Sequence, residues 1–278
     1  MNFGKLAQRA GSGVLFLVVV IGCMLWPWGF AVLTVLLGVI LSLEFYRMTV
    51  DRRYRKEEAC IIAAVVATTL LGVFVPLLGI PVRWMLAGMI PVLAASVFLL
   101  FDCAESHDFP AAVYFPLVYV MLPLLAAQLL TRPFGGPYEW RLLLGLFVLM
   151  WSNDVGAYVV GMSFGQRPDS RKLFPALSPK KSWIGFVGGT AFTFLAAWVV
   201  AATFGASVLP MVHWFVLALI VSVFGVLGDL FESLVKRHAQ VKDAGRLIPG
   251  HGGLLDRFDD VLFVLPAAAI YLKLLQLI

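Results

Sequence analysis

A stripe of polar side chains lies near the end of a long apolar run. Asp229 is followed at three, four and seven positions by Glu232, Ser233 and Lys236. In a helix, residues at these intervals share one face. An ionisable group at the centre of a bilayer costs at least ~2.5–3.5 kcal/mol, so the stripe predicts an inward-facing functional site. The alternative is a self-neutralising pair of Glu232 with Lys236, which leaves Asp229 unexplained.

A second group of carboxylates opens the last apolar run. Asp256, Asp259 and Asp260 are spaced for one helical face. Capping at a helix N-terminus is the ordinary role of such residues. Three close carboxylates repel one another, however, and a divalent cation removes that repulsion. Oxygen ligands favour Mg²⁺ over zinc, so we predict a metal site drawn from Asp229, Asp256, Asp259 and Asp260.

A glycine-rich segment, Pro249-Gly250-His251-Gly252-Gly253, separates the two acidic groups. Its glycines let the backbone approach a ligand and present N–H groups to anionic oxygens. The flanking cations suit a polyphosphate, and they are Lys236, Arg237, Lys242 and Arg257. His251 either donates to phosphate or braces the turn, and the sequence leaves both open.

Two further segments carry candidate binding residues. Ser178-Pro179-Lys180-Lys181 precedes a predicted helix, where its lysines suit a phosphate or a lipid headgroup. The alternative role for these lysines is anchoring at the cytoplasmic surface. Asn153-Asp154, with Tyr158, lies deep in an apolar run. An intramembrane aspartate is a functional candidate by default, and Asn153 is a candidate partner for it.

The elements that must position these residues are transmembrane helices. The 278 residues are 61% hydrophobic and 13% charged, with a mean hydropathy of +0.94, whereas soluble domains have about 25% charged residues. At about 20 residues per span, the fold predicted is an all-α bundle of about nine helices, over 14–26, 29–47, 59–78, 84–101, 110–130, 141–163, 183–204, 211–234 and 257–276. We expect the charges within spans to gather in the sixth, eighth and ninth helices.

The basic residues predict the orientation. With a cytoplasmic N-terminus, all but four of the 21 Lys and Arg residues lie inside, the exceptions being Arg83, Arg132, Arg141 and Lys273. The polar loops 164–182 and 235–257 are then cytoplasmic. We read the first span as a retained signal-anchor. We expect residues 1–140 to form a scaffold with a dimerisation role and residues 141–278 to form the catalytic region. Tryptophans near span ends, including Trp214, are expected to be interfacial anchors. The net charge of +5 is explained by this bias, and no nucleic-acid partner is expected.

The run from Ser233 to Asp259, SLVKRHAQVKDAGRLIPGHGGLLDRFD, resembles the hallmark segment of the phosphatidate cytidylyltransferases, or CDP-diacylglycerol synthases. The fixed positions of that hallmark are occupied by Ser233, Lys236, Arg237, Lys242, Asp243, His251, Gly252, Gly253, Asp256, Arg257 and Asp259. Asn153-Asp154 with Ala157-Tyr158 and Gly161, and Ser178-Pro179-Lys180-Lys181, resemble two further motifs of the family. The second motif usually continues Thr-x-Glu-Gly. Here Ser182 keeps the hydroxyl, but Ile184 replaces the acid.

The resemblance implies that CTP and phosphatidic acid give CDP-diacylglycerol and pyrophosphate, with Mg²⁺ and a second, monovalent cation such as K⁺. It implies metal binding by Asp229 and Asp256 with Asp259 nearby, and a nucleotide-phosphate site lined by Ser233 and Lys236. We assign catalysis to Asp229, Ser233, Lys236 and Asp256. Substrate binding is assigned to Asn153, Asp154, Tyr158, Ser178, Lys180, Lys181, Arg237, Lys242, His251, Gly252, Gly253 and Arg257. A homodimer in the inner (cytoplasmic) membrane of a bacterium is expected.

Two other functions remain open at this point. A membrane phosphotransferase acting on a lipid phosphate would also use Asp clusters and Mg²⁺, although its characteristic spacings are not found here. A transporter would use Asp154 and Asp229 as an ion pathway, which broken helices and inverted repeats would favour. Neither feature is evident in the sequence. Dependence on a nucleotide separates an enzyme from a transporter, and CTP against a sugar nucleotide separates the two enzymes.

Overall fold

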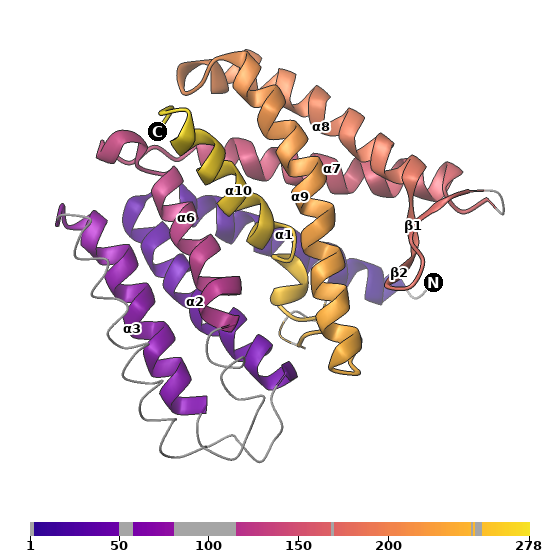
Figure 1. Ribbon diagram of the computed structural model, residues 1–278, viewed down its shortest axis with the longest axis horizontal. Helices are drawn as coiled ribbons and strands as arrows, with labels where there is room; N and C mark the ends of the chain where they lie inside the picture. Colours follow the sequence, from indigo (N-terminus) through magenta and orange to yellow (C-terminus); the bar gives the residue numbers. More distant parts are fainter. Residues whose placement is uncertain (1–2, 50–57, 81–114, 168–169, 246, 248–251) are drawn as a thin grey trace. The chain divides into compact units, whose positions relative to one another are not determined.

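The computed structural model describes residues 3–49, 58–80, 115–167, 170–245, 247 and 252–278, which are mostly helical (Figure 1). The longer helices are α1 (Phe3–Met24), α2 (Pro27–Thr49), α3 (Glu58–Leu77), α6 (Leu122–Leu130), α7 (Arg141–Phe164), α8 (Trp183–Thr203), α9 (Met211–His238) and α10 (Val261–Leu274). Short turns of helix are η3 (Leu117–Met121), η4 (Pro133–Gly135), η5 (Gly205–Ser207) and η6 (Leu255–Arg257). The strands are β1 (Lys172–Phe174) and β2 (Ser178–Ser182).

The apolar helices confirm a multi-pass membrane protein. Helices α2, α7, α8 and α9 are each long and apolar enough to cross a membrane. Shorter apolar helices cover 13–24, 62–75, 117–130 and 261–274. The predicted span 84–101 lies outside the described residues. The number of spans and the orientation of the N-terminus therefore stay predictions.

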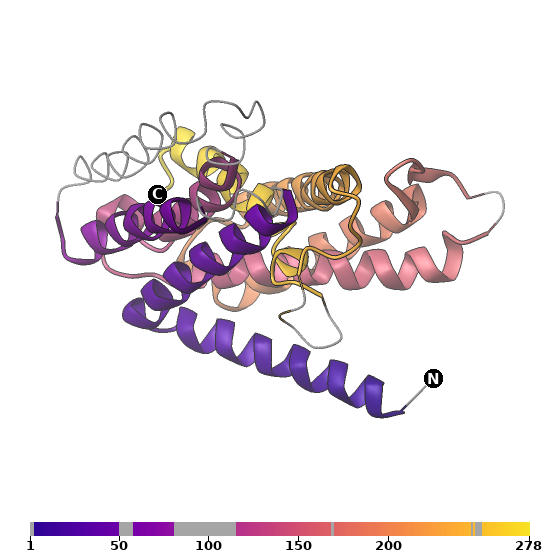
Figure 2. The same cartoon turned by 90° about the horizontal axis from the view of Figure 1, so that it is seen from below.

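The chain forms two compact units, which divide it differently from the predicted halves. Unit 1 contains residues 1–128 and 239–258, and unit 2 contains residues 129–238 and 259–278. In unit 1, α1 and α2 form a helical hairpin (Figure 2), and α2 also packs on α3, η3 and η6. Buried polar contacts join these helices, because Gln128 Nε2 donates to Thr34 Oγ1 at 2.8 Å and Thr69 Oγ1 donates to Met121 Sδ at 3.1 Å.

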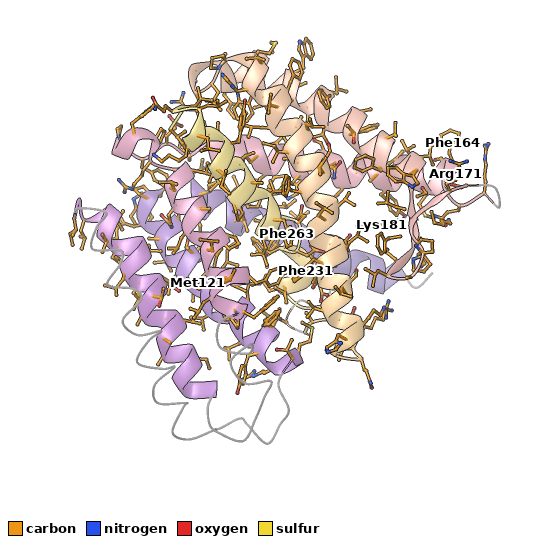
Figure 3. All side chains as sticks on the ribbon, viewed as in Figure 1. Met121, Phe164, Arg171, Lys181, Phe231 and Phe263 are labelled. Carbon is orange, nitrogen blue, oxygen red and sulfur yellow. The ribbon has the colours of Figure 1, made fainter. Side chains whose placement is uncertain are left out.

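Unit 2 is a bundle of α7, α8, α9 and α10 in which small residues allow close packing. Helices α7 and α8 lie side by side. A Cβ added at Gly188 would stand 2.4 Å from Val160 Cβ, so a larger residue there would push the two helices apart. Helix α9 packs on α10, where the rings of Phe231 and Phe263 stand 5.4 Å apart (Figure 3).

Three sequence expectations are corrected by these elements. The last helix begins at Val261 rather than at residue 257, because residues 255–257 form the separate turn η6. Helix α9 continues to His238, four residues beyond the predicted span. Trp214 is fully buried against Gly145 and Gly205 and donates its Nε1–H to the Gly205 carbonyl at 3.2 Å, so it is a core residue and not an interfacial anchor.

Candidate active site

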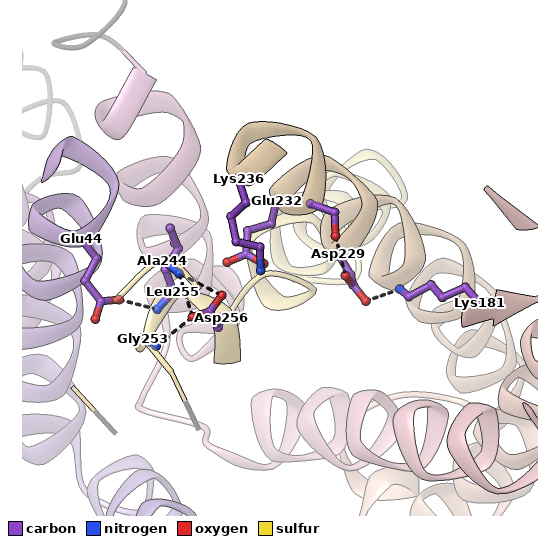
Figure 4. A network of polar contacts seen from close by, with 10 residues as sticks. Glu44, Lys181, Asp229, Glu232, Lys236, Ala244, Gly253, Leu255 and Asp256 are labelled. Atoms are coloured by element: carbon purple, nitrogen blue, oxygen red, sulfur yellow. Dashed lines mark hydrogen bonds and ion pairs between the residues drawn. The ribbon is translucent and has the colours of Figure 1, made fainter. Parts of the chain in front are cut away.

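The polar stripe of α9 contains two linked pairs of side chains. Lys236 Nζ donates to Glu232 Oε2 at 2.5 Å, and Glu232 is only 1% exposed. Ser233 Oγ donates to Asp229 Oδ1 at 3.4 Å (Figure 4). The Glu232–Lys236 pair that we weighed as an alternative is therefore present. Asp229 lies outside that pair.

A lysine from a different segment contacts Asp229. Lys181 Nζ forms an ion pair with Asp229 Oδ2 (Figure 4). Lys181 lies on β2, which pairs antiparallel with β1 so that Lys172 faces Ser182 and Phe174 faces Ser178. Because successive side chains of a strand point to opposite sides, Lys180 is exposed whereas Lys181 is half-buried. This short hairpin is an exception to the all-helical prediction.

The hairpin is joined rigidly to α8 by a serine. The Ser182 side chain is buried and accepts a hydrogen bond from the Gly185 N–H at 3.2 Å, which caps the first turn of α8. Lys181 immediately precedes this cap. The hydroxyl at position 182 therefore has a structural role, and it places the preceding lysine. Ile184, where the family motif has an acid, is 42% exposed.

Four carboxylates of unit 2 influence one another electrostatically near the start of α10. The negative charges of Asp154, Asp259 and Asp229 all act on Asp260, and the charges of Lys236 and Lys181 act on Asp259. Asp260 caps α10, accepting from the Val261 N–H at 2.7 Å. The backbone of Asp259 approaches α9 so closely that a Cβ added at Gly228 would stand 2.3 Å from its carbonyl oxygen.

Asn153 lies on a different side of α7 from Asp154 and Tyr158, which are four residues apart and share one face. Asn153 is buried and accepts a hydrogen bond from Thr193 Oγ1 of α8 at 3.2 Å. Asp154 is exposed, and Tyr158 is 69% exposed. The buried amide thus joins α7 to α8, while the acidic and phenolic groups stay accessible.

The carboxylates of unit 2 suit a hard cation by their chemistry. Asp229, Asp259 and Asp260 offer only oxygen atoms, the ligands that Mg²⁺ prefers, and they concentrate negative charge. Within the described part of the chain, no three Asp, Glu, His or Cys side chains are gathered closely enough to hold a metal ion. The metal site therefore stays a prediction.

In unit 1, Asp256 organises the loop that precedes it. We call residues 239–245, 247 and 252–254, the described parts of the segment between α9 and η6, the signature loop. Asp256 accepts from the Gly253 N–H at 2.8 Å and from the Ala244 N–H at 3.0 and 3.2 Å. Gly252 has φ of +86°, a conformation that favours glycine. Because Asp256 lies in η6, it does not share a helical face with Asp259 and Asp260, contrary to our expectation.

Glu44 of α2 is a site residue that sequence reasoning missed. Its Oε2 accepts from the Leu255 N–H at 2.7 Å (Figure 4). We expected charges within spans to gather in the sixth, eighth and ninth helices, and Glu44 corrects that expectation because it lies in the second. The signal was available, since a carboxylate in an apolar span is a functional candidate by default.

The remaining candidates differ in their exposure to solvent. Arg237, Lys242 and Arg257 are exposed, which suits cations that meet a soluble anion. Ser178 is half-buried at the start of β2, and Gly253 is buried. His251 lies outside the described residues, so neither of its two predicted roles is tested.

Comparison with known proteins identifies the family of the chain. A sequence profile described as the cytidylyltransferase family matches residues 7–275. The chain belongs to the cytidylyltransferase family. This membership confirms the resemblance on which the candidate residues were assigned, and it extends over the N-terminal helices, where no motif had been found.

Curated relatives of the family carry a more specific name. The chain is similar to the phosphatidate cytidylyltransferase of Bacillus subtilis (strain 168), with 47% identity over 119 residues, 43% of this chain and 42% of the relative. Proteins of the same name from Staphylococcus epidermidis (strain RP62A) and Staphylococcus aureus (strain COL) are 44% identical over 134 residues, 48% and 47% of this chain and 49% and 48% of those relatives. The matched region thus spans less than half the length of each relative.

Proposed function

We propose that the protein transfers CMP from CTP to phosphatidic acid, giving CDP-diacylglycerol and pyrophosphate. Membership of the cytidylyltransferase family supports the transfer, and the name of the curated relatives supports phosphatidate as the acceptor. The apolar helices supply the setting that a lipid acceptor requires. The protein would act at the cytoplasmic face of the inner membrane, where both predicted polar loops lie.

The reaction needs no protein nucleophile. A phosphate oxygen of phosphatidic acid attacks the α-phosphorus of CTP, and the bond from that phosphorus to the bridging oxygen of the β-phosphate breaks. Pyrophosphate leaves with the electron pair of that bond. Both substrates are anions, so catalysis requires that their mutual repulsion is neutralised and that the reacting atoms are aligned.

The ion pair of Lys181 with Asp229 is the observation that carries this proposal. It brings together two motif segments, the β hairpin and α9, that lie 48 positions apart in the sequence. Lys181 and Lys236 are then the cations that bind and neutralise the phosphates of CTP. Ser233, which donates its one hydroxyl hydrogen to Asp229, would exchange that acceptor for a phosphate oxygen. In this role each lysine exchanges a carboxylate partner for a phosphate.

We propose Mg²⁺ dependence with Asp229, Asp259 and Asp260 of unit 2 as ligands. That Asp256 binds a cation stays a prediction that rests on the motif alone. When bound, Mg²⁺ would act as a Lewis acid toward the CTP phosphates and the departing pyrophosphate. Asp154 adds negative charge to the same group of carboxylates. A second, monovalent cation and a homodimer are proposals carried by the family resemblance.

Nucleotide selection tests the proposed function. Purified protein in detergent micelles is incubated with phosphatidic acid, Mg²⁺ and labelled CTP, ATP or a UDP-sugar in parallel reactions. Label should enter the lipid phase only from CTP, and EDTA should abolish the transfer. Transfer from the UDP-sugar alone would instead indicate a phosphotransferase, and no transfer by folded protein would favour the transporter.

A further inference from the structure

We propose that Glu44 of α2 is a positioning residue that holds the signature loop and η6 in the arrangement needed for the proposed transfer. This inference rests on the proposed function for its effect on catalysis. Its structural part concerns only unit 1. None of the motifs by which the site was predicted includes Glu44, which lies more than 200 positions earlier in the chain than Asp256.

The first observation is a hydrogen bond to the start of a helix turn. Glu44 Oε2 accepts from the N–H of Leu255 at 2.7 Å, and Leu255 is the first residue of η6. The N–H groups in the first turn of a helix have no partner within the helix, so an outside carboxylate satisfies one of them. Asp256, the next residue, is thereby fixed at its backbone by a side chain from α2.

The second observation is the fit of two glycines around the same carboxylate. A Cβ added at Gly245 would stand 2.3 Å from Glu44 Oε1, and one added at Gly253 would stand 2.8 Å from Glu44 Oε2. Gly245 and Gly253 also meet each other, since the same Cβ on Gly253 would stand 2.6 Å from the Gly245 nitrogen. Gly245 and Gly253 therefore both pack against the Glu44 carboxylate.

A third observation links this contact to the motif. Asp256 accepts from the N–H groups of Ala244 and Gly253. Ala244 is next to Gly245, and both Gly245 and Gly253 pack against Glu44. The carboxylate of Glu44 comes from α2 and that of Asp256 comes from η6. Together they hold Ala244, Gly245 and Gly253 close to one another. Loss of Glu44 should therefore displace Asp256 and the N–H groups of the loop, although Glu44 itself is given no contact with substrate.

The test compares Glu44→Leu with Glu44→Gln. Leucine removes the acceptor oxygens and replaces them with an apolar side chain of similar size. Glutamine keeps one oxygen that can accept from the Leu255 N–H. We expect Glu44→Leu to lower kcat/KM by about ten- to a hundredfold, the range for one hydrogen bond to a charged group. Glu44→Gln should stay within about threefold of the native protein, because an N–H···O bond remains.

Hydrogen exchange of the substrate-free protein separates the structural claim from the catalytic one. Glu44→Leu should speed exchange of the amides of residues 253–256 by at least about tenfold, with no change in α7 and α9. The matched control is Thr34→Val, which breaks the buried hydrogen bond to Gln128 on the same helix and should leave the loop protected. Unchanged loop exchange in Glu44→Leu, or a loss in Glu44→Gln as large as in Glu44→Leu, would overturn the proposal.

A double-mutant cycle tests the contact itself. Gly245→Ala should be damaging in the native protein, because its methyl group meets Glu44 Oε1, and nearly harmless in Glu44→Ala, where that oxygen is gone. Effects on loop exchange that simply add would contradict the contact. If the native protein shows no transfer from CTP, the proposed function fails, while the exchange experiments still decide the role of Glu44.

Discussion

Carboxylates of the two units are used in different ways. In unit 2, Asp229 and Glu232 each bind a lysine side chain, Lys181 and Lys236 respectively. In unit 1, Glu44 and Asp256 bind backbone N–H groups. A lysine on a flexible stem can exchange a carboxylate for a phosphate, whereas a backbone N–H that is closed into a loop cannot move away. Unit 2 therefore contains charged side chains that can change partner when substrates bind. The carboxylates of unit 1 instead fix the backbone of the signature loop and η6.

Asp229→Asn should have the largest effect on turnover, because it breaks the ion pair of Asp229 with Lys181 in unit 2. The substitution preserves the size of the side chain but removes the charge that pairs with Lys181 and that is proposed to bind Mg²⁺. We expect kcat to fall by about a hundred- to a thousandfold, with little change in the thermal unfolding midpoint because the side chain is partly exposed. Initial rates and a melting curve on the same preparation check this. Near-normal turnover would contradict the assignment of Asp229.

Lys181→Met should weaken CTP binding. The variant retains the length of the side chain and loses its charge, so we expect the KM for CTP to rise about tenfold. The comparison variant is Lys180→Met, whose side chain is exposed on the other side of β2 and should have the smaller effect. Steady-state kinetics with varied CTP measure both. An equal or larger rise in KM for Lys180→Met would show that the hairpin binds CTP through its other side.

Asp256→Ala should differ from Asp229→Asn by destabilising the protein. Loss of its carboxylate leaves the N–H groups of Ala244 and Gly253 without that acceptor, at a cost of about 1–3 kcal/mol in the free energy of unfolding. Denaturation in mixed micelles would measure the loss. Native stability together with lost activity would indicate that Asp256 acts on a ligand and not through the loop.

Glu139, which precedes α7 in unit 2, provides the smallest expected effect. Hydrogen bonds from the Arg141 side chain lower the pKa of Glu139 below its usual value of 4.5. A lowered pKa means that the ionised form stabilises the folded protein, fully so above pH 4.5, and that this contribution is lost as the pH falls through the folded pKa. Glu139→Gln should therefore slightly lower the unfolding midpoint at pH 7, by an amount that shrinks as the pH falls below 4.5, and leave turnover unchanged. A difference that stays constant as the pH is lowered would contradict this.

The features that sequence could predict are those set by local pattern. Apolar runs of membrane length located α7, α8 and α9, and helical spacing placed Asp229 and Ser233 on one face. Contacts that depend on folding at a distance were not accessible. The pair of Lys181 with Asp229 requires the β hairpin, whose strands are too short and polar to be recognised.

The start of the last helix shows a second limit. Asp256, Asp259 and Asp260 have helical spacing, yet the backbone N–H groups of the signature loop compete for Asp256 and hold it in a separate turn. Glu44 is a different case, because the rule for charges in apolar spans applied to it directly. The partner of Glu44, a backbone N–H more than 200 residues away, leaves no pattern in the sequence.

The most direct test of the proposed transfer follows the two ends of the CTP triphosphate. Purified protein and phosphatidic acid are incubated with CTP labelled either at the α-phosphate or at the γ-phosphate, and the lipid and aqueous phases are separated. Attack at the α-phosphorus predicts that the α label enters the lipid as CDP-diacylglycerol while the γ label is released as pyrophosphate. Entry of the γ label into lipid, or retention of both labels in CTP by folded protein, would contradict it.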